Sequence, residues 1–403
     1  MFLIFDTYSG KKREFRPLDK KTVKIYTCGP SVYEYSHIGN FRTYLFEDIL
    51  VRYLQYLGYR VLRVMNITDV EDKAIEKAEV EGIGLIDLQK PKIERFFEEF
   101  DALGMLRPDI VAKASEHIKE TVELIEKIEK NNYAKLLEDG IYFDILKFRE
   151  YGKLSKIKNA KYSGIERNDD YSKVTLRDFC LWKKTNNQIS WNSKYGKGRP
   201  GWHIECSAIA KKYLGDQFDI HCGGSDNIFP HHENEIAQMQ CVSGRVPANY
   251  WIHCKHLTIG KKKMSKRTGN VLYVKELAKC DVPSECLRYY LISEKYRNKL
   301  DFTTERFKQE ICRVHEMIEI FERVGDFGSR SESFDARVYN RIITEFEDAM
   351  NNDLNTKLAF RRVFRELLNA EKELNLGKMS REKAKGISSA IEKIDKVFGI
   401  FVS

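Results

Sequence analysis

The chain has 403 residues, which is too long for one ordinary hydrophobic core and fits two or three domains. Hydrophobic residues make up 42% and charged residues 32%, which excludes a disordered protein, and no apolar run approaches the roughly 20 residues of a membrane span. The formal net charge of +9 is compatible with a polyanionic partner such as RNA, but it is weak support by itself.

The cysteine pattern and the amino terminus bear on the compartment. Nine cysteines are scattered along the chain, and their odd number and wide spacing favour reduced thiols, some of which could hold a metal ion. The segment 1–15 has a short apolar patch without a preceding basic region, so we do not expect it to be a signal peptide. These features predict a cytoplasmic protein with no membrane partner.

The first third of the chain alternates between predicted strands and helices. A β-like run at 23–27 ends at Cys28, and apolar residues at helical spacing follow over 45–57. A nearly continuous apolar run at 61–67 is typical of a buried parallel strand. This order predicts a doubly wound, Rossmann-type α/β sheet, whose ligands bind at the carboxyl ends of the strands. The loop 28–37 is therefore a candidate active-site loop.

The pattern changes after residue 110. The segment 111–200 combines a charged helical stretch with text rich in Gly, Asn and Lys, which predicts an inserted domain. Apolar runs at 218–222 and 251–254 predict two further strands. From about residue 305 onward apolar residues recur every three or four positions, which predicts an all-α helical bundle.

Two short segments are suited to holding phosphate. The segment 37–40, His-Ile-Gly-Asn, stands at the mouth of a predicted helix, where free N–H groups and a partial positive charge attract anions. The segment 263–266, Lys-Met-Ser-Lys, lies in a loop rich in Gly and Lys that can neutralise charge on a transferring phosphate. Alone, each is more often an ordinary helix start or a solvated basic loop. The pair in this order is far less expected by chance.

The pair resembles the signatures of class I aminoacyl-tRNA synthetases, usually His-Ile-Gly-His and Lys-Met-Ser-Lys-Ser. Asn40 replaces the second histidine but can still donate a hydrogen bond, and Arg267 replaces the final serine but keeps the loop cationic. Within that class, the chain resembles the cysteinyl-tRNA synthetase family over most of 23–270. The matching segments are YTCGPSVYEYSHIGN, NITDVEDK, GRPGWHIECSAIA, DIHCGGSDNIFPHHENEIAQ and KMSKRTGN.

The resemblance implies an order of domains. We expect the first half of a Rossmann-type catalytic domain at 1–110, an inserted connective domain at 111–200, and the second half of the catalytic domain with a zinc site at 201–255. A loop and stem region at 256–305 and a tRNA-binding helical bundle at 306–403 should follow.

The resemblance also implies one Zn²⁺ per chain, held by Cys28, Cys206, His231 and Glu235. His231 and Glu235 are four apart after Pro230, a favoured first helical position, so they would share one helix face. Two thiolates, an imidazole and a carboxylate are credible zinc ligands, although the spacing is not that of a zinc finger. From the residues alone, a core thiol at Cys206 and surface groups at His231 and Glu235 remain the commoner interpretation.

Such a metal would distinguish cysteine from serine. A hydrophobic pocket separates isosteres poorly, by about a hundredfold, whereas a bond to sulfur uses the softness and acidity of the thiol. Four protein ligands usually mark a closed structural site, so the metal must accept a fifth ligand or bind Glu235 weakly.

Roles at further positions follow from the resemblance. The implied catalytic residues are His37, Lys263 and Lys266. ATP, with Mg²⁺ on its phosphates, is expected to contact Gly39, Asn40, Gly223, Gly224, Asp226 and Lys266. The amino acid is expected to contact Trp202, Thr68 and His221, with Asp69 beside Thr68. The ordinary alternative for Trp202 is a core tryptophan, and His203, His232 and Asp72 are interpreted as structural.

The implied reaction is activation of L-cysteine by ATP to cysteinyl-adenylate and transfer to tRNA(Cys), by a monomeric enzyme. The chain stops at Ser403, without the small anticodon-contacting domain expected of such proteins, so anticodon recognition is left open. One alternative is a related ligase that joins cysteine to an amino sugar, as in mycothiol synthesis, which the Lys- and Ile-rich composition disfavours. The other is a non-catalytic RNA-binding paralogue, which the intact His37, Lys263 and Lys266 disfavour.

Overall fold

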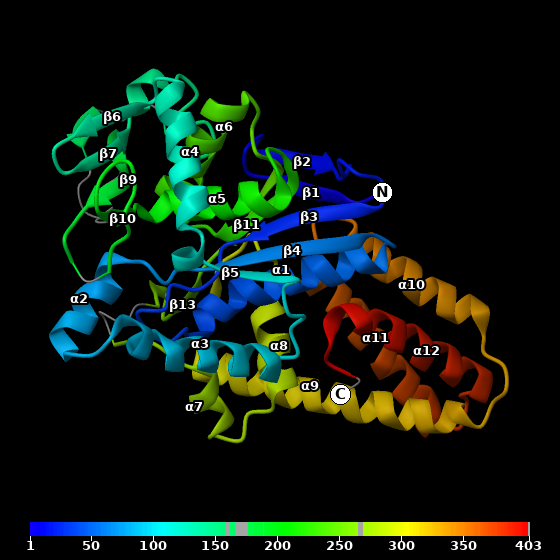
Figure 1. Ribbon diagram of the computed structural model, residues 1–403. Coiled ribbons are helices and arrows are strands. Elements are labelled where there is room, and N and C mark those ends of the chain that lie inside the picture. Colours follow the sequence, from blue (N-terminus) through cyan, green and yellow to red (C-terminus); the bar gives the residue numbers. More distant parts are fainter. Residues whose placement is uncertain (158–161, 166–175, 188, 265–268, 402–403) are drawn as a thin grey trace.

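The centre of the molecule is a parallel sheet (Figure 1). The computed structural model describes residues 1–157, 162–165, 176–187, 189–264 and 269–401. In this sheet the strands run in the order β12-β11-β3-β4-β5, and all neighbours pair in parallel. Their bounds are Thr22–Thr27 for β3, Arg60–Ile67 for β4, Ile110–Lys113 for β5, Phe218–Gly224 for β11 and Ala248–Cys254 for β12. The chain order reverses between β3 and β11, and such a switch point is where doubly wound sheets bind ligands.

Helices cover both faces of this sheet. Helices α1 (Ile38–Tyr56) and α3 (Leu85–Ala102) lie on one face, and α5 (Trp202–Leu214) lies on the other (Figure 1). Helix α1 is buried along most of its length, which suits an element packed between the sheet and other helices. Helices α2 (Asp72–Glu81) and α6 (Glu233–Ser243) complete this part. The arrangement confirms the predicted Rossmann-type fold.

A second sheet stands between β5 and α5 in the sequence. It is antiparallel along β10-β9-β7-β6, and β8 pairs in parallel with β9. The buried residues of α4 are three or four apart, so this helix packs one apolar face inward. The bounds are Ile118–Lys130 for α4, Ala134–Leu137 for β6, Gly140–Phe143 for β7, Tyr162–Ile165 for β8, Leu176–Lys184 for β9 and Gly198–Pro200 for β10, with the helical turns η1 at Ala114–Glu116 and η2 at Ile145–Lys147.

A small third sheet connects the catalytic body with the carboxyl-terminal part. Strand β13 pairs antiparallel with β14 and parallel with β15. The bounds are Leu257–Ile259 for β13, Lys262–Lys263 for β14, Val274–Ala278 for α7, Ser284–Ile292 for α8 and Leu300–Phe302 for β15. At the other end of the chain, the amino-terminal strands β1 (Leu3–Asp6) and β2 (Lys11–Glu14) form a hairpin.

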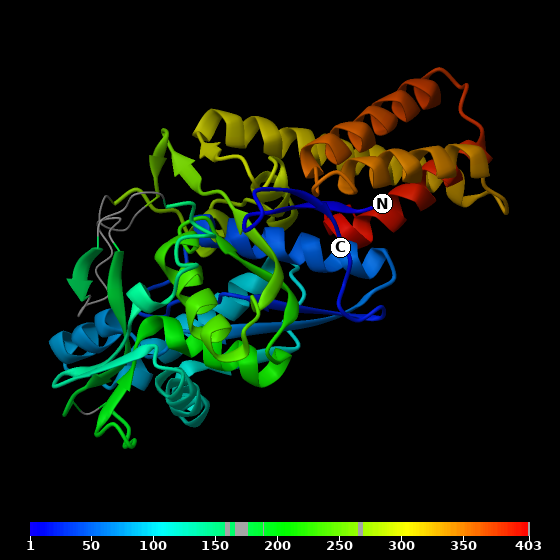
Figure 2. The same ribbon diagram turned by 90° about the horizontal axis from the view of Figure 1, so that it is seen from above.

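The last hundred residues form the predicted helical bundle, which is confirmed. Its helices are α9 (Thr304–Ser329), α10 (Ala336–Met350), α11 (Thr356–Asn375) and α12 (Arg381–Phe398). Each begins after a residue whose side-chain oxygen accepts a hydrogen bond from a free backbone N–H of the first turn, namely Thr303, Asp335, Asn355 and Ser380. The bundle and the second sheet stand at opposite ends of the molecule (Figure 2). Within the described ranges, no helix is long and apolar enough to cross a membrane.

Candidate active site

A cavity of about 500 Å³ opens where β3, β4 and β11 end, at the switch point of the sheet. Its walls come from the loop after β3, the start of α1, the end of β4, the start of α5 and the turn after β11. The lining residues are Cys28, Gly29, Pro30, Ser31, Tyr33, Tyr35, Ser36, His37, Asn40, Thr43, Tyr44, Asn66, Thr68, Trp202, Cys206, Gly224, Asp226, Asn227, His231 and Met264.

The segment 37–40 forms the amino terminus of α1, as its sequence predicts. The ring Nδ1 of His37 accepts the backbone N–H of Asn40 at 3.2 Å, and the side-chain oxygen of Asn40 accepts the backbone N–H of His37 at 3.0 Å. This reciprocal pair is a capping box, which fixes the first turn of the helix. Both residues line the cavity, so a helix terminus with partial positive charge faces the place of a ligand.

The second signature meets the first at this cavity. Met264 is buried and lines the cavity, and a Cβ atom placed on Gly39 would lie only 3.6 Å from its sulfur atom. Lys263 is the last residue of β14. Lys266 lies outside the described residues.

Four buried side chains converge beside the cavity. One ligand atom each from Cys28, Cys206, His231 and Glu235 lies within 4.8 Å of all the others. Cys28 follows β3, Cys206 lies in α5 and Glu235 lies in α6. His231 lies in the π-helical turn η3 (Ile228–His232), which runs directly into α6 at Glu233 after the extended residue Phe229. His231 Nε2 lies 3.1 Å from Glu235 Oε1, so the two residues share one face, as their spacing predicts.

A hydrogen bond between the two thiols sets their protonation. Hydrogen bonding with Cys28 lowers the pKa of Cys206 to about 6. The same bond, together with burial, raises the pKa of Cys28 well above its usual range. Burial also lowers the pKa of His203 and of His232, which keeps both rings neutral at pH 7. Binding of a metal ion to both sulfurs requires their deprotonation.

The donor set fits a zinc ion. Glu235 Oε1 lies 3.1 Å from His231 Nε2, yet it accepts no hydrogen bond from any described residue. A buried carboxylate oxygen without a donor is costly unless a cation compensates it. A second group, Cys28, His221, His232 and Glu235, is equally compact. Cys28 belongs to both groups and lines the cavity. Cys206 and His231 of the first group also line it, whereas His221 and His232 of the second do not, so the first group faces a ligand with more of its members.

Histidines that do not line the cavity contact the side chains of the cluster. His221 Nε2 bonds to Glu235 Oε2 at 2.9 Å, and His203 Nδ1 bonds to His231 Nδ1 at 2.7 Å. His232 lies with its Nε2 3.2 Å from the Cys28 sulfur. Through Nδ1, His232 bonds to His253, which in turn bonds to Thr7. Sequence reasoning did not give His203 and His232 a functional position, although the consecutive histidines at 231 and 232 were a signal.

Several predicted binding residues line the cavity, but others do not. Trp202 lines it and stacks on the His231 ring at a centroid distance of 4.7 Å. His221 does not line it, because its buried ring bonds to Glu235 and stacks on Trp251. Asp69 is turned toward Ser115, which donates to it through its backbone and hydroxyl. Both residues thus hydrogen-bond to protein groups, and the expected ligand contacts of His221 and Asp69 stay predictions.

Of the residues around Gly223 and Gly224 that are expected to contact the nucleotide, not all line the cavity. Gly224 and Asp226 line the cavity, and the Asp226 side chain is about half exposed. A Cβ atom on Gly223 would lie 2.8 Å from the His232 ring, so this glycine makes room for a protein side chain. Thr68 lines the cavity while its hydroxyl accepts a hydrogen bond from the side-chain amide of Asn66 at 3.0 Å.

Comparison with known proteins decides the family. Residues 14–312 match the model of the class I (C) tRNA synthetase catalytic domain, and residues 345–402 match the DALR domain model. A cysteine--tRNA ligase of Chlamydia pneumoniae is 41% identical, over 98% of this chain and 85% of that protein. The chain belongs to the cysteine--tRNA ligase family of class I tRNA synthetases. A member of this family from Thermococcus onnurineus is 38% identical, over 99% of this chain and 86% of that protein.

Solved structures agree with this family at the level of the fold. Methionyl-tRNA synthetase of Mycobacterium tuberculosis, determined with methionyl-adenylate, superposes with a TM-score of 0.71 at 12% identity. The superposition covers 94% of this chain and 92% of that one. The resemblance to the cysteinyl-tRNA synthetase family that the sequence indicated is thus confirmed.

Proposed function

We propose that this chain activates L-cysteine with ATP and transfers the cysteinyl group to tRNA(Cys), giving Cys-tRNA(Cys), AMP and diphosphate. One observation carries the proposal: the thiol, imidazole and carboxylate cluster adjoins the same cavity as the helix terminus at His37. A site for sulfur beside a site for phosphate suits a reaction between a thiol-bearing amino acid and ATP. The names of the relatives described above support the same activity.

In the first step, the carboxylate of cysteine attacks the α-phosphate of ATP in line, and pyrophosphate leaves. His37, Asn40 and the amino terminus of α1 hold phosphate oxygens. Lys263 and Lys266 neutralise the charge that develops on the leaving group, and Mg²⁺ bound with ATP would supply further charge neutralisation. Positioning and charge stabilisation suffice for this step, so Cys28 and Cys206 are not nucleophiles.

The remaining nucleotide contacts come from the turn after β11. Gly39 and Gly224 bring backbone close to the nucleotide, and the Asp226 carboxylate accepts hydrogen bonds from ribose hydroxyls. In the second step, a terminal ribose hydroxyl of tRNA takes the acyl group from the adenylate, and AMP leaves.

For the amino acid, Cys28, Cys206, His231 and Glu235 would hold one Zn²⁺ per chain. When bound, zinc supplies a soft Lewis acid that binds a thiolate well and a neutral hydroxyl poorly, which separates cysteine from serine. Trp202 packs against the amino acid and fixes the orientation of the His231 ring by stacking on it.

The bundle offers a surface for tRNA. A groove between α9 and α11 is lined by Arg313, Arg361, Arg362 and Arg365 together with Leu358, Phe364, Leu368 and Asn369. The Arg313 guanidinium lies 5.2 Å from the centre of the Phe364 ring. Arginines beside apolar and aromatic side chains suit RNA, because they can pair with phosphates while the rings receive bases or riboses.

Two measurements test the function. Cysteine-dependent exchange of labelled pyrophosphate into ATP reports the first step, with serine as the control amino acid. Transfer of labelled cysteine is then compared between tRNA and an amino sugar. We expect exchange with cysteine but not with serine, and label on tRNA alone. Label on the amino sugar would favour the small-molecule ligase, and absence of exchange would favour the non-catalytic paralogue.

A further inference from the structure

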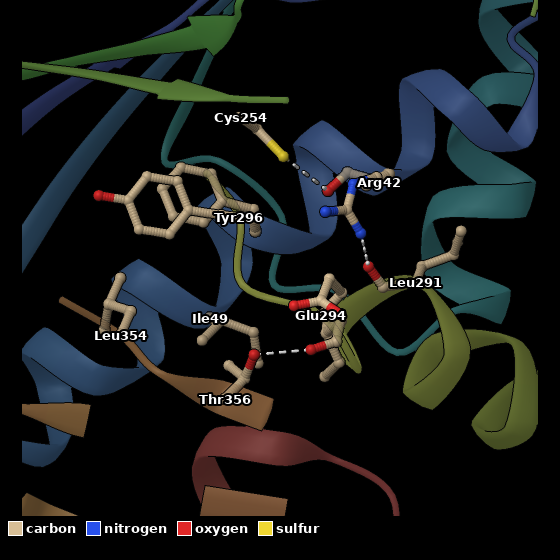
Figure 3. Close-up of a pocket in the computed structure, with 10 residues that line it drawn as sticks. Arg42, Ile49, Cys254, Leu291, Glu294, Tyr296, Leu354 and Thr356 are labelled. Carbon is tan, nitrogen blue, oxygen red and sulfur yellow. Dashed lines mark hydrogen bonds between the residues drawn. The ribbon is translucent and has the colours of Figure 1, made fainter. Parts of the chain in front are cut away.

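Arg42, in the second turn of α1, is almost completely buried, with 1% of its surface exposed. Its guanidinium donates to four backbone carbonyl oxygens: through Nε to Lys255 at 3.0 Å, and through its two terminal nitrogens to Leu291 at 2.8 Å, Lys295 at 3.3 Å and Asn298 at 2.9 Å. Figure 3 shows this side chain reaching from α1 toward Leu291, beside Cys254. A buried cation is costly unless its hydrogen bonds are satisfied, and here four carbonyl oxygens satisfy them.

The four acceptors belong to the connections of the third sheet. Leu291 lies in the last turn of α8, where carbonyl oxygens lack partners within the helix and carry partial negative charge. Lys295 and Asn298 lie between α8 and β15, and Lys255 lies between β12 and β13. One guanidinium therefore holds both chain segments that enter this sheet.

The third sheet carries the second signature. Its strand β13 pairs with β15 through Leu257 and Leu300, and with β14, which ends at Lys263. The two segments that Arg42 holds are also bonded to each other, because the N–H of Lys255 donates to Tyr296 O at 2.7 Å. They form one unit that leads directly into the segment 263–266.

The same arginine is rigidly connected to the first signature. It stands two residues after Asn40 in α1, one turn from the capping box at His37. Other described contacts also join these parts: Ile38 N donates to Leu272 O at 2.9 Å, and the Phe46 ring of α1 stacks on Tyr296 at 4.3 Å. Arg42 adds four hydrogen bonds from one side chain between α1 and the segments that enter the third sheet.

We propose that Arg42 is a positioning residue, which fixes strand β14 and Met264 of the second signature relative to His37 and the start of α1. The proposal rests on the proposed function, because it concerns the lysines that assist adenylate formation. Arg42 does not line the cavity of the active site and does not touch substrate. It acts through the third sheet, whose strand β14 ends at Lys263.

Other arginines attach the helical bundle to the rest of the chain. Arg288 donates to Asp48 at 2.6 Å and to the backbone oxygens of Leu103 and Phe398. Arg52, also in α1, donates to Asp48 and to the backbone oxygens of Gly104 and Lys396. Arg52 is thus a matched control, since it links the same helix to the bundle and not to the third sheet.

The first test measures cysteine-dependent pyrophosphate exchange in Arg42→Met, Arg42→Lys and Arg52→Met. A shift of the lysines by about 1 Å predicts a loss in kcat on the order of 100-fold for Arg42→Met, with the KM for cysteine and the zinc content unchanged. Arg42→Lys, which keeps the charge but cannot reach four carbonyls, should lie between it and the wild type. Arg52→Met should stay within about threefold. Equal losses in Arg42→Met and Arg52→Met would overturn the proposal.

The second test asks whether Arg42 acts through the lysine. Lys266→Ala is introduced into the wild type and into Arg42→Met. If Arg42 serves to place the lysine, Lys266→Ala should cost far less in the second background. Fully multiplicative losses would refute the proposal. Should Arg42→Met fail to fold, Arg42→Lys takes its place in both tests. A wild-type chain without exchange would refute the proposed function, whereas wild-type exchange that Arg42→Met leaves intact would refute only the positioning role.

Discussion

Replacement of His221 by phenylalanine should weaken metal binding without disturbing the fold. The His221 ring is 1% exposed, and its Nε2 bonds to Glu235 Oε2 at 2.9 Å. The ring also stacks on Trp251 at 4.5 Å, and its other nitrogen has no partner among the described residues. Phenylalanine keeps the stacking and the volume, so the variant removes essentially one hydrogen bond.

The expected change in zinc affinity follows from the hydrogen bond that Glu235 loses. A hydrogen bond to a charged group is worth about 1.5 to 3 kcal/mol. Without its donor, the Glu235 carboxylate is less firmly oriented toward the metal. Loss of such a supporting bond typically lowers metal affinity about 10- to 100-fold. We therefore expect the zinc Kd of His221→Phe to rise by about that factor at pH 7.

The assay is competition for zinc between the purified chain and a chromophoric chelator. Trp251→Phe is the control, because it keeps a ring against His221 and leaves the bond to Glu235 intact; its Kd should stay within about threefold. Thermal unfolding of both variants in excess chelator shows whether the fold is equally stable. If His221→Phe binds zinc as tightly as the wild type, then Glu235 is not a ligand or does not need His221 to be one.

Three further predictions concern other parts of the molecule. Lys266→Ala should slow adenylate formation by orders of magnitude while barely changing cysteine affinity, and an unchanged pyrophosphate-exchange rate would rule out its role. Arg313→Glu combined with Arg361→Glu should raise the KM for tRNA and lower the salt dependence of tRNA binding, leaving pyrophosphate exchange intact. The same change in tRNA binding from Arg337→Glu, at an exposed side chain of α10, would exclude a specific groove. Burial raises the pKa of Glu47 from 4.5 to about 7 although Arg63 lies 2.9 Å away. The folded chain therefore binds this proton more tightly than the unfolded chain, and the carboxyl group costs about 2 kcal/mol of stability as the pH rises from 5 to 7. Glu47→Gln lacks that cost, so its urea midpoint should fall less than that of the wild type over this interval; identical pH dependence would show that Glu47 is already ionised at pH 5.

The spacing of apolar residues along the sequence was sufficient to predict helices and strands of the catalytic body. The apolar run at 61–67 is part of β4, the helical spacing over 45–57 lies largely in α1, and both follow from side-chain periodicity alone. The segment 37–40 could be placed at a helix terminus for the same reason. What local pattern does not reveal is the use of Asn40, whose oxygen completes the cap by bonding to the His37 backbone.

By itself, the sequence determined which residues are chemically able to form the site and, through its resemblance to a family, which four were candidates for one metal. Only the tertiary structure decided how the remaining polar residues are used. His221 and Asp69 point to protein partners, and Arg42, which in sequence is an ordinary polar residue of a helix, is enclosed by four carbonyl groups. The reason is physical: burial forces each polar group to find a partner, and those partners lie far away in the sequence, where periodicity and spacing carry no information.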